Sequence, residues 1–163
     1  MTIYETVDSL VREYCTSDPF ELCESLGVKV KVTFIGDLKG LYTFIDDVPV
    51  IVISEKLKRP ARNIVCAHEL GHHILHAEVA ANDCLRGFTF FNMREKTEYE
   101  ANVFMADLLI EDDDLDDIFK SGSTVEEASA LLCLPSDIVR IKMEDMNRRG
   151  YMYPDQGHAR YFG

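Results

Sequence analysis

The sequence predicts an α+β fold, in which a small antiparallel three-stranded sheet packs on one central helix and a C-terminal helical appendage follows. Three observations lead to this prediction. Strand-like alternation is confined to residues 28–53, helical spacing dominates the remainder, and apolar residues make up 47% of the 163 residues, enough for a core. We expect one domain at residues 1–118 and a helical subdomain with a tail at residues 119–163, the two forming one compact unit.

Two short helices are expected before the sheet. In the first helix the apolar residues recur every three or four positions, at Ile3, Val7, Leu10, Val11 and Tyr14. Asp18-Pro19 predicts the start of the second helix, because Asp caps helix N-termini and Pro suits the first helical position. Gly27 predicts the end of that helix.

Three strands are expected next. Residues 28–35 alternate, which predicts a half-buried strand whose inner side carries Val28, Val30, Val32 and Phe34. Residues 41–45 form a second strand and residues 50–53 a third, more fully buried one. Asp46-Asp47 between them predicts a turn, so these two strands should form a hairpin.

Helices are expected over most of the remaining chain. Residues 60–76 have apolar residues at helical spacing: Ile64, Ala67, Gly71, Ile74 and Leu75. Further helices are expected at residues 97–110, 124–132 and 136–149. The acidic run at residues 111–117 is interpreted as a solvated surface. Phe88 to Phe91 forms an apolar patch, for which both a substrate-contacting loop and core packing remain open.

The helix expected at residues 60–76 carries the motif His68-Glu69-Leu70-Gly71-His72, which reads H-E-x-x-H. Residues four apart lie on one face of a helix, so both imidazoles can reach a single metal ion. Glu69 then lies beside the ion, where it can take a proton from the water that completes the coordination. The motif therefore predicts a catalytic zinc site with His68 and His72 as ligands and Glu69 as the catalytic residue.

Two histidines do not complete such a site, because catalytic zinc takes three protein ligands and leaves one position open. Glu98 and Glu100 are both candidates for the third ligand, and they point to different faces of their helix. Glu98 shares its face with Ala101, Met105 and Leu108, and a buried carboxylate needs a strong reason such as a metal ion. We therefore expect Glu98 to be the third ligand.

Other polar residues receive supporting roles. Asn102 lies one turn after Glu98, and its side-chain oxygen is expected to fix the orientation of His68. His73 is expected to point away from the site, and His76 to pack or to support a ligand rather than to bind metal. For the group that stabilises the transition state the sequence leaves four candidates: Tyr99, Tyr151, Tyr153 and His158.

Composition excludes several classes of protein. No apolar run approaches the length of a membrane span, and the N-terminus lacks the pattern of a secretory signal. The five cysteines are odd in number and form no C-x-x-C pair, so we expect reduced thiols in a cytoplasmic protein. The net charge of −12 makes direct binding to nucleic acid unlikely as a function, although residues 124–149 resemble a helix-turn-helix in outline.

H-E-L-G-H-H-I-L-H from His68, followed by E-Y-E-A-N from Glu98, resembles the ImmA/IrrE family of metallopeptidases, with similarity over roughly residues 41–134. The resemblance implies a zincin-like domain in which His68, His72 and Glu98 bind Zn²⁺ and Glu69 is catalytic. It also implies a phage-related zinc endopeptidase of narrow regulatory specificity, which cleaves a helix-turn-helix transcriptional repressor. The alternative is a non-catalytic protein-binding module that retains the fold, although such a module has no chemical use for Glu69.

Overall fold

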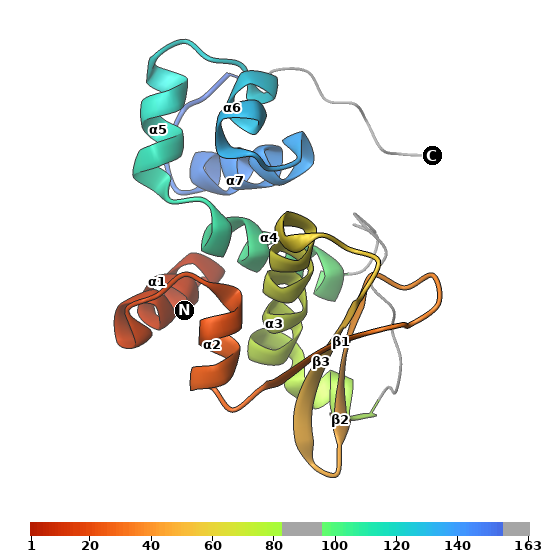
Figure 1. Cartoon of the computed structure of the whole chain (residues 1–163). Coiled ribbons are helices and arrows are strands. Elements are labelled where there is room, and N and C mark those ends of the chain that lie inside the picture. The colour runs from red at the N-terminus through yellow and green to blue at the C-terminus, as the bar shows by residue number, and fades with distance from the viewer. Residues whose placement is uncertain (83–95, 155–163) are drawn as a thin grey trace. The chain divides into compact units, whose positions relative to one another are not determined.

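The computed structural model describes residues 1–82 and 96–154. The expectations for Phe88 to Phe91 and for His158 therefore lie outside the described residues. The chain folds as two compact units, Met1–Leu109 and Ile110–Gly163 (Figure 1). The first unit contains four helices and the sheet, and the second contains three helices, all within the described part of the chain. This arrangement confirms the α+β fold class.

The first two helices begin where the sequence predicts. Helix α1 spans Ile3–Tyr14, and its N-terminus is closed by a capping box between Thr2 and Glu5. Helix α2 spans Pro19–Ser25, and the Asp18 side chain accepts the backbone N–H groups of Phe20 and Glu21. Both caps satisfy backbone donors that the first turn of a helix cannot satisfy by itself.

The sheet has three strands, β1 (Lys29–Thr33), β2 (Gly40–Ile45) and β3 (Val48–Ser54), in the order β1-β3-β2. Strands β2 and β3 form the expected antiparallel hairpin, but β1 pairs with β3 in parallel, so the expectation of a wholly antiparallel sheet is wrong. The loop at residues 34–39 carries the chain past the central position to the far edge. The hairpin then returns β3 to that position, in the same direction as β1.

The hairpin turn is formed by Asp46 and Asp47, which both have positive φ, at 51° and 61°. Two successive residues in this conformation match the right-handed twist of the flanking strands. Strand β1 departs from the prediction, because Val32 is 42% exposed and Phe34 is 63% exposed. The strand lies at the edge of the sheet, and of the four residues expected on its inner side only Val28, just before the strand, is buried. Alternation alone cannot reveal this.

Helix α3 (Arg59–Asn82) lies between the sheet and helix α4 (Lys96–Leu109), so it is the central helix of the first unit (Figure 1). Regular helical geometry breaks at His76, where φ is −137° and ψ is 24°. The core of this unit is formed by fully buried side chains from the sheet and both helices, including Ile51, Ile53, Val65, Leu70, Phe104 and Met105.

The second unit is built from α5 (Asp112–Lys120), α6 (Val125–Leu132) and α7 (Ser136–Arg148). Its core contains Leu115, Val125, Ala128, Ile138 and Met146. The acidic run forms the start of helix α5, where negative side chains favour the positive end of the helix dipole. The division at Leu109 places α5 with the C-terminal helices, earlier in the chain than the boundary expected at residue 118.

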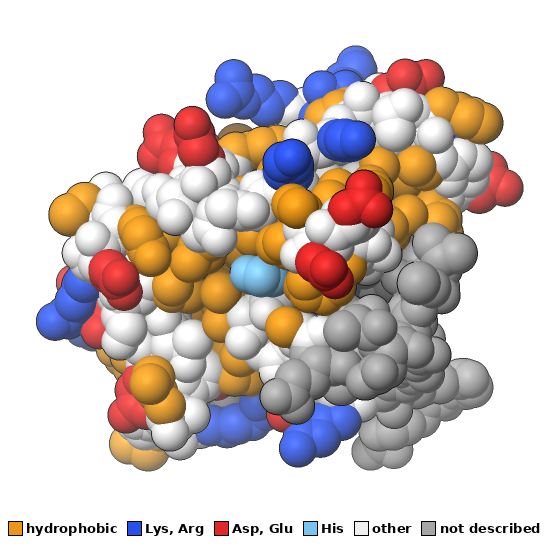
Figure 2. Space-filling view, turned by 90° about the horizontal axis from the view of Figure 1, so that it is seen from below, with side chains coloured by type: hydrophobic (Ala, Val, Ile, Leu, Met, Phe, Trp, Pro, Cys, Tyr) orange, Lys and Arg blue, Asp and Glu red, His pale blue; other side chains and the backbone are white. Residues whose placement is uncertain are grey.

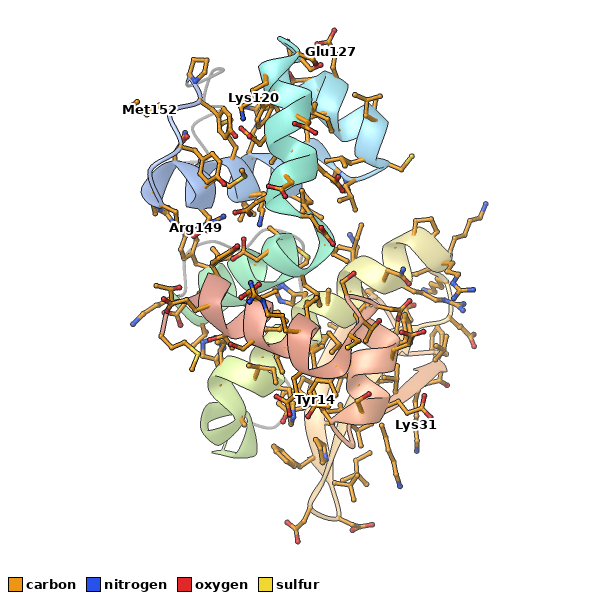
Figure 3. All side chains as sticks on the ribbon, turned by 90° about the vertical axis from the view of Figure 1, so that its left-hand side faces the viewer. Tyr14, Lys31, Lys120, Glu127, Arg149 and Met152 are labelled. Carbon is orange, nitrogen blue, oxygen red and sulfur yellow. The ribbon has the colours of Figure 1, made fainter. Side chains whose placement is uncertain are left out.

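A buried ion-pair network explains why α5 belongs to the second unit. Asp112, at the start of α5, lies 2.6 Å from Nζ of Lys142, whose side chain is 1% exposed. The same carboxylate also pairs with both terminal nitrogens of Arg149, which is labelled at the end of α7 in Figure 3. Arg149 also bonds Asp145 at 2.7 Å. The network joins the first turn of α5 to α7.

The described cysteines are free and differ sharply in burial. Cys15 and Cys133 are exposed, and each ends a helix in the left-handed conformation with φ of 54°. Cys23 and Cys66 are fully buried, with their Sγ atoms 3.8 Å apart. The hydrogen bond with Cys23, together with burial, raises the pKa of the Cys66 thiol far above its ordinary value. Within residues 1–82 and 96–154, no helix is long and apolar enough to cross a membrane.

Candidate metal centre

Helix α3 places the two histidines of the motif side by side. The rings of His68 and His72 lie 4.8 Å apart between centroids, and their Nε2 atoms are 3.1 Å apart. His68 is fully buried, whereas the side chain of His72 is 17% exposed. Figure 2 shows one histidine side chain at the surface among hydrophobic side chains. The Nε2 atoms of His68 and His72 are close enough to share one metal ion, and His72 is the more accessible of the two residues.

Helix α4 supplies a carboxylate to the same point. One oxygen of Glu98 lies 3.4 Å from Nε2 of His68, and the other lies 3.3 Å from Nε2 of His72. The close approach of the two helices depends on Gly71, because a Cβ there would lie 3.2 Å from the backbone of Ala101. The glycine within the motif thus lets α4 approach the histidines closely enough for Glu98 to reach them.

The three side chains fit a metal ion. Their ligand atoms all lie within 4.8 Å of one another. Among the residues that the structure describes, these three form the cluster of His, Cys, Asp or Glu side chains that could hold a metal ion. A tetrahedral zinc ion with bonds of about 2.0–2.1 Å separates its ligand atoms by about 3.3 Å. The observed separations of 3.1, 3.3 and 3.4 Å agree with that spacing. Two imidazole nitrogens and one carboxylate oxygen also form a donor set that zinc accepts.

The electrostatics of the cluster favour ligand protonation states suited to a cation. Burial lowers the pKa of His68 to about 4, so its ring is neutral at pH 7. Burial raises the pKa of Glu98, but the His68 and His72 imidazoles beside the carboxylate outweigh this and hold it at about 2. A neutral imidazole and an ionised carboxylate are the forms that bind metal.

Asn102, also on α4, supports His68 from behind. Its side-chain oxygen lies 3.0 Å from Nδ1 of His68, and the residue is 1% exposed. With Nδ1 donating to this oxygen, the lone pair of the ring is on Nε2, which faces the cluster. The structure therefore brings Asn102 and His68 together as the sequence predicts.

Glu69 is buried beside the cluster. The residue is 1% exposed, and its buried Oε1 atom accepts no hydrogen bond from any residue that the structure describes. Burial and the charge of Glu98 raise its pKa well above 4.5, while a hydrogen bond from the backbone N–H of Tyr42 acts in the opposite direction. A Cβ at Gly40 would lie 3.1 Å from Oε1, so β2 packs directly against the carboxylate. An unsatisfied carboxylate oxygen here suits a water molecule as its partner.

His73 lies outside the ligand cluster and faces strand β2. Its Nδ1 atom lies 2.7 Å from the hydroxyl of Tyr42, and the two rings meet edge to face with centroids 5.3 Å apart. Tyr42 itself is 6% exposed, and burial raises its pKa to about 12. No sequence pattern pairs these residues, since the contact depends on how the sheet packs on α3.

His76 and Glu100 form a second pair beside the cluster. Nε2 of His76 lies 2.9 Å from Oε2 of Glu100, and the His76 ring is tilted against His72 at 5.6 Å between centroids. Glu100 also lies 3.5 Å from Lys96, and its pKa is lowered chiefly by the hydrogen bond from His76. The structure thus brings Glu98 to the cluster and engages Glu100 elsewhere.

The four candidates for the transition-state donor remain unassigned. Tyr99 lies on α4, whereas Tyr151 and Tyr153 belong to the second unit. The hydroxyl of Tyr153 donates to Asp116 at 2.5 Å, which occupies its donor.

Comparison with known proteins places the chain in a family. The model of peptidase family M78, described as the IrrE N-terminal-like domain, matches residues 23–144. "Uncharacterized immunity region protein 2" of Bacillus phage phi105 is 29% identical over 141 residues, covering 86% of this chain and 88% of that protein. "Metallopeptidase ImmA" of Bacillus subtilis strain 168 is 26% identical over 152 residues, covering 88% and 85% respectively. The family match spans both helices that carry the cluster, and this chain therefore belongs to the ImmA/IrrE family of metallopeptidases.

Proposed function

We propose that this protein is a zinc endopeptidase of narrow specificity, whose substrate is a helix-turn-helix transcriptional repressor. The convergence of His68, His72 and Glu98 at zinc-like spacing, with the Glu69 carboxylate beside them, carries the proposal. His68, His72 and Glu98 would hold the ion, and Asn102 would orient His68. When bound, the ion supplies Lewis acidity toward a water molecule and the scissile carbonyl.

Glu69 has the properties of a proton carrier in this reaction. Its raised pKa means that the carboxylate holds a proton taken from water long enough to pass it to the leaving amine. The charge of a bound cation would oppose this shift and lower the pKa of Glu69. Its burial keeps bulk water away from the carboxylate, which strengthens its interactions with the reacting groups.

The edge of β2 that pairs with no other described strand, here called its free edge, is the surface that we propose for the substrate. Strand β2 lies at one edge of the sheet, and Gly40 and Tyr42 on it contact Glu69. An extended peptide that pairs with this edge would bring its backbone carbonyl close to the catalytic carboxylate. Backbone pairing is independent of sequence, so narrow specificity would require further contacts with the folded substrate.

A repressor substrate follows from the family resemblance and from the phage relative, which is named an immunity region protein. We further propose that the protein acts in the cytoplasm, where a transcriptional repressor is found. The buried thiols of Cys23 and Cys66 remain free at 3.8 Å, which fits a reducing compartment.

The experiment combines the purified protein, Zn²⁺ and candidate helix-turn-helix repressors, beginning with any encoded beside its gene, and identifies cleavage products by mass spectrometry. We expect a single cleavage by the wild type, none by Glu69→Gln, and no cleavage of casein by either. Glu100→Gln is the matched control, because it changes a carboxylate near the cluster that pairs with His76 instead.

Native mass spectrometry on the same samples reports the zinc content. Glu69→Gln should bind one Zn²⁺ per chain like the wild type, since Glu69 is not one of the three clustered ligands. Cleavage that persists in Glu69→Gln, or zinc-independent cleavage, would contradict the proposed role. Repressor binding without cleavage by the wild type would instead indicate the non-catalytic module.

A further inference from the structure

The backbone of β2 alternates in direction, and this determines what Tyr42 can bind. The N–H of Ser54 on β3 donates to the C=O of Lys39 at 2.9 Å, so Lys39 points toward β3. In an antiparallel pair, alternate residues point toward and away from the partner strand. Leu41 therefore faces β3, whereas Gly40 and Tyr42 direct their backbone groups toward the free edge. The N–H of Tyr42 uses that direction to donate to Glu69.

The side chain of Tyr42 fixes the same residue to α3 at a second point. Its hydroxyl lies 2.7 Å from Nδ1 of His73, which is four positions after Glu69 and thus one helical turn away. The ring also packs edge to face against the His73 ring at 5.3 Å and 73°. The backbone and the side chain of Tyr42 thus contact two successive turns of α3, the helix that carries the motif.

The contact leaves little space for β2 to move. A Cβ at Gly40 would lie 2.3 Å from a methyl carbon of Val65, which is fully buried on α3. Only a strand lacking a side chain at this position can approach the helix so closely. The hydroxyl–imidazole bond is therefore the polar anchor of a strand held tightly against α3.

We infer that Tyr42 is a positioning residue for Glu69: its bond to His73 holds β2 so that the Tyr42 N–H stays on the catalytic carboxylate. The inference rests on the proposed function. Tyr42 acts through Glu69, and His73 acts through Tyr42. Because a misplaced reacting group lowers the rate even when substrate still binds, loss of the Tyr42–His73 bond (the tether) lowers kcat and leaves KM unchanged.

The test is a set of four variants assayed for repressor cleavage. Tyr42→Phe removes only the hydroxyl, and His73→Leu removes its partner. The double variant shows whether the two losses have one cause. In His73→Asn, the amide oxygen takes the place of Nδ1 as an acceptor for the hydroxyl. Tyr14→Phe is the matched control, because Tyr14 (labelled in Figure 3) lies at the end of α1 in the same unit, away from the tether.

We expect kcat to fall about ten- to a hundredfold in Tyr42→Phe and His73→Leu, with KM within about twofold of the wild type. The double variant should lose no more than either single variant, and His73→Asn should recover most of the activity. Equal kcat in Tyr42→Phe and Tyr14→Phe would overturn the inference, as would multiplicative losses in the double variant. A rise in KM with kcat unchanged would assign Tyr42 to substrate binding instead and would also overturn the inference.

A second measurement does not depend on cleavage. Amide hydrogen exchange at residue 42 should be at least about tenfold faster in Tyr42→Phe and His73→Leu than in the wild type, and unchanged in Tyr14→Phe. Unchanged exchange at residue 42 overturns the tether whatever the enzyme assay shows. A wild type that cleaves nothing, with exchange accelerated as expected, refutes the proposed function and leaves the tether established.

Discussion

The side-chain oxygen of Asn102 lies 3.0 Å from Nδ1 of His68, while Nε2 of the same ring lies 3.1 Å from His72 and 3.4 Å from Glu98. Nδ1 of this buried imidazole is thus held by Asn102, and Nε2 faces the other two clustered side chains. Since the ring is fully buried, water cannot replace the support if the asparagine is removed.

Asn102→Leu should therefore weaken zinc binding about 10- to 100-fold, because the ring loses the group that fixes its tautomer. Asn102→Asp keeps an oxygen at the same position and should retain most of the affinity. Competition with a chromophoric chelator measures both values. Equal affinities for the wild type and Asn102→Leu would remove Asn102 from its supporting role.

Glu98→Gln should lower zinc affinity much more than Glu100→Gln. The first change replaces a carboxylate that lies 3.3–3.4 Å from both histidines, and the second replaces one that pairs with His76. An amide is a poor zinc ligand, because it carries no negative charge. Zinc-to-protein ratios after dialysis against a weak chelator report the difference. The assignment of the third ligand fails if both variants keep their zinc equally.

Gly40→Ala should destabilise the protein by about 1–3 kcal/mol, because the new methyl group overlaps the buried side chain of Val65. Val65→Ala removes the atom that it would meet, although this change also costs stability on its own. The double variant should be more stable than the sum of the two single effects predicts. Urea unfolding of the four proteins gives the coupling free energy. A coupling near zero would mean that β2 shifts freely along α3.

Asp112→Asn should lower the free energy of unfolding of the second unit by about 3 kcal/mol. It removes the anion that pairs with Lys142 and Arg149, so the buried charge of Lys142 loses its ion pair with Asp112. Asp113→Asn, one residue along the same helix at an exposed position, should change stability by less than about 0.5 kcal/mol. Thermal unfolding followed by circular dichroism compares the two variants.

The same network predicts a pH dependence. Burial alone would raise the pKa of Asp112, but hydrogen bonds from Arg149 and Lys142 lower it by more. The net pKa therefore lies below its ordinary value of 3.8. The unfolded chain then binds the proton more tightly, so this contribution to stability is complete above pH 3.8 and is lost as the pH falls through the folded value. Denaturant unfolding between about pH 2.5 and 6 should show a fall in stability at the acid end, reduced in Asp112→Asn. A parallel fall in that variant would assign the effect to other carboxyl groups.

Local patterns predicted the other described helices but not α5, because the acidic run at its start was interpreted only as a solvated surface. The helix start at Asp18-Pro19 was predicted and is present, whereas the capping box at Thr2 emerged only from the structure. Strand β1 was predicted with the wrong direction relative to its neighbour and with the wrong burial. Whether Val32 faces a core depends on which strand lies beside it and on what covers the sheet, and alternation contains neither fact.

The candidate site shows the same division between local and long-range information. A spacing of four residues brings His68 and His72 together on any helix. The choice of Glu98 rested on an apolar stripe, yet α4 is buried on every side from Ala101 to Leu108, so the stripe does not separate the two glutamates. The close approach at Gly71 is what brings Glu98 to the histidines. The contacts of Tyr42 with Glu69 and His73 depend on the docking of the sheet and could not be predicted.

The burial of the cysteines offers a natural pair of attachment points for spectroscopic labels. Cys15 in the first unit and Cys133 in the second are exposed, while Cys23 and Cys66 are enclosed and resist maleimide reagents. After Cys84→Ser, a donor and an acceptor dye would occupy one position in each unit without any engineered cysteine. Energy transfer between the dyes then follows the two units in solution as a repressor is added.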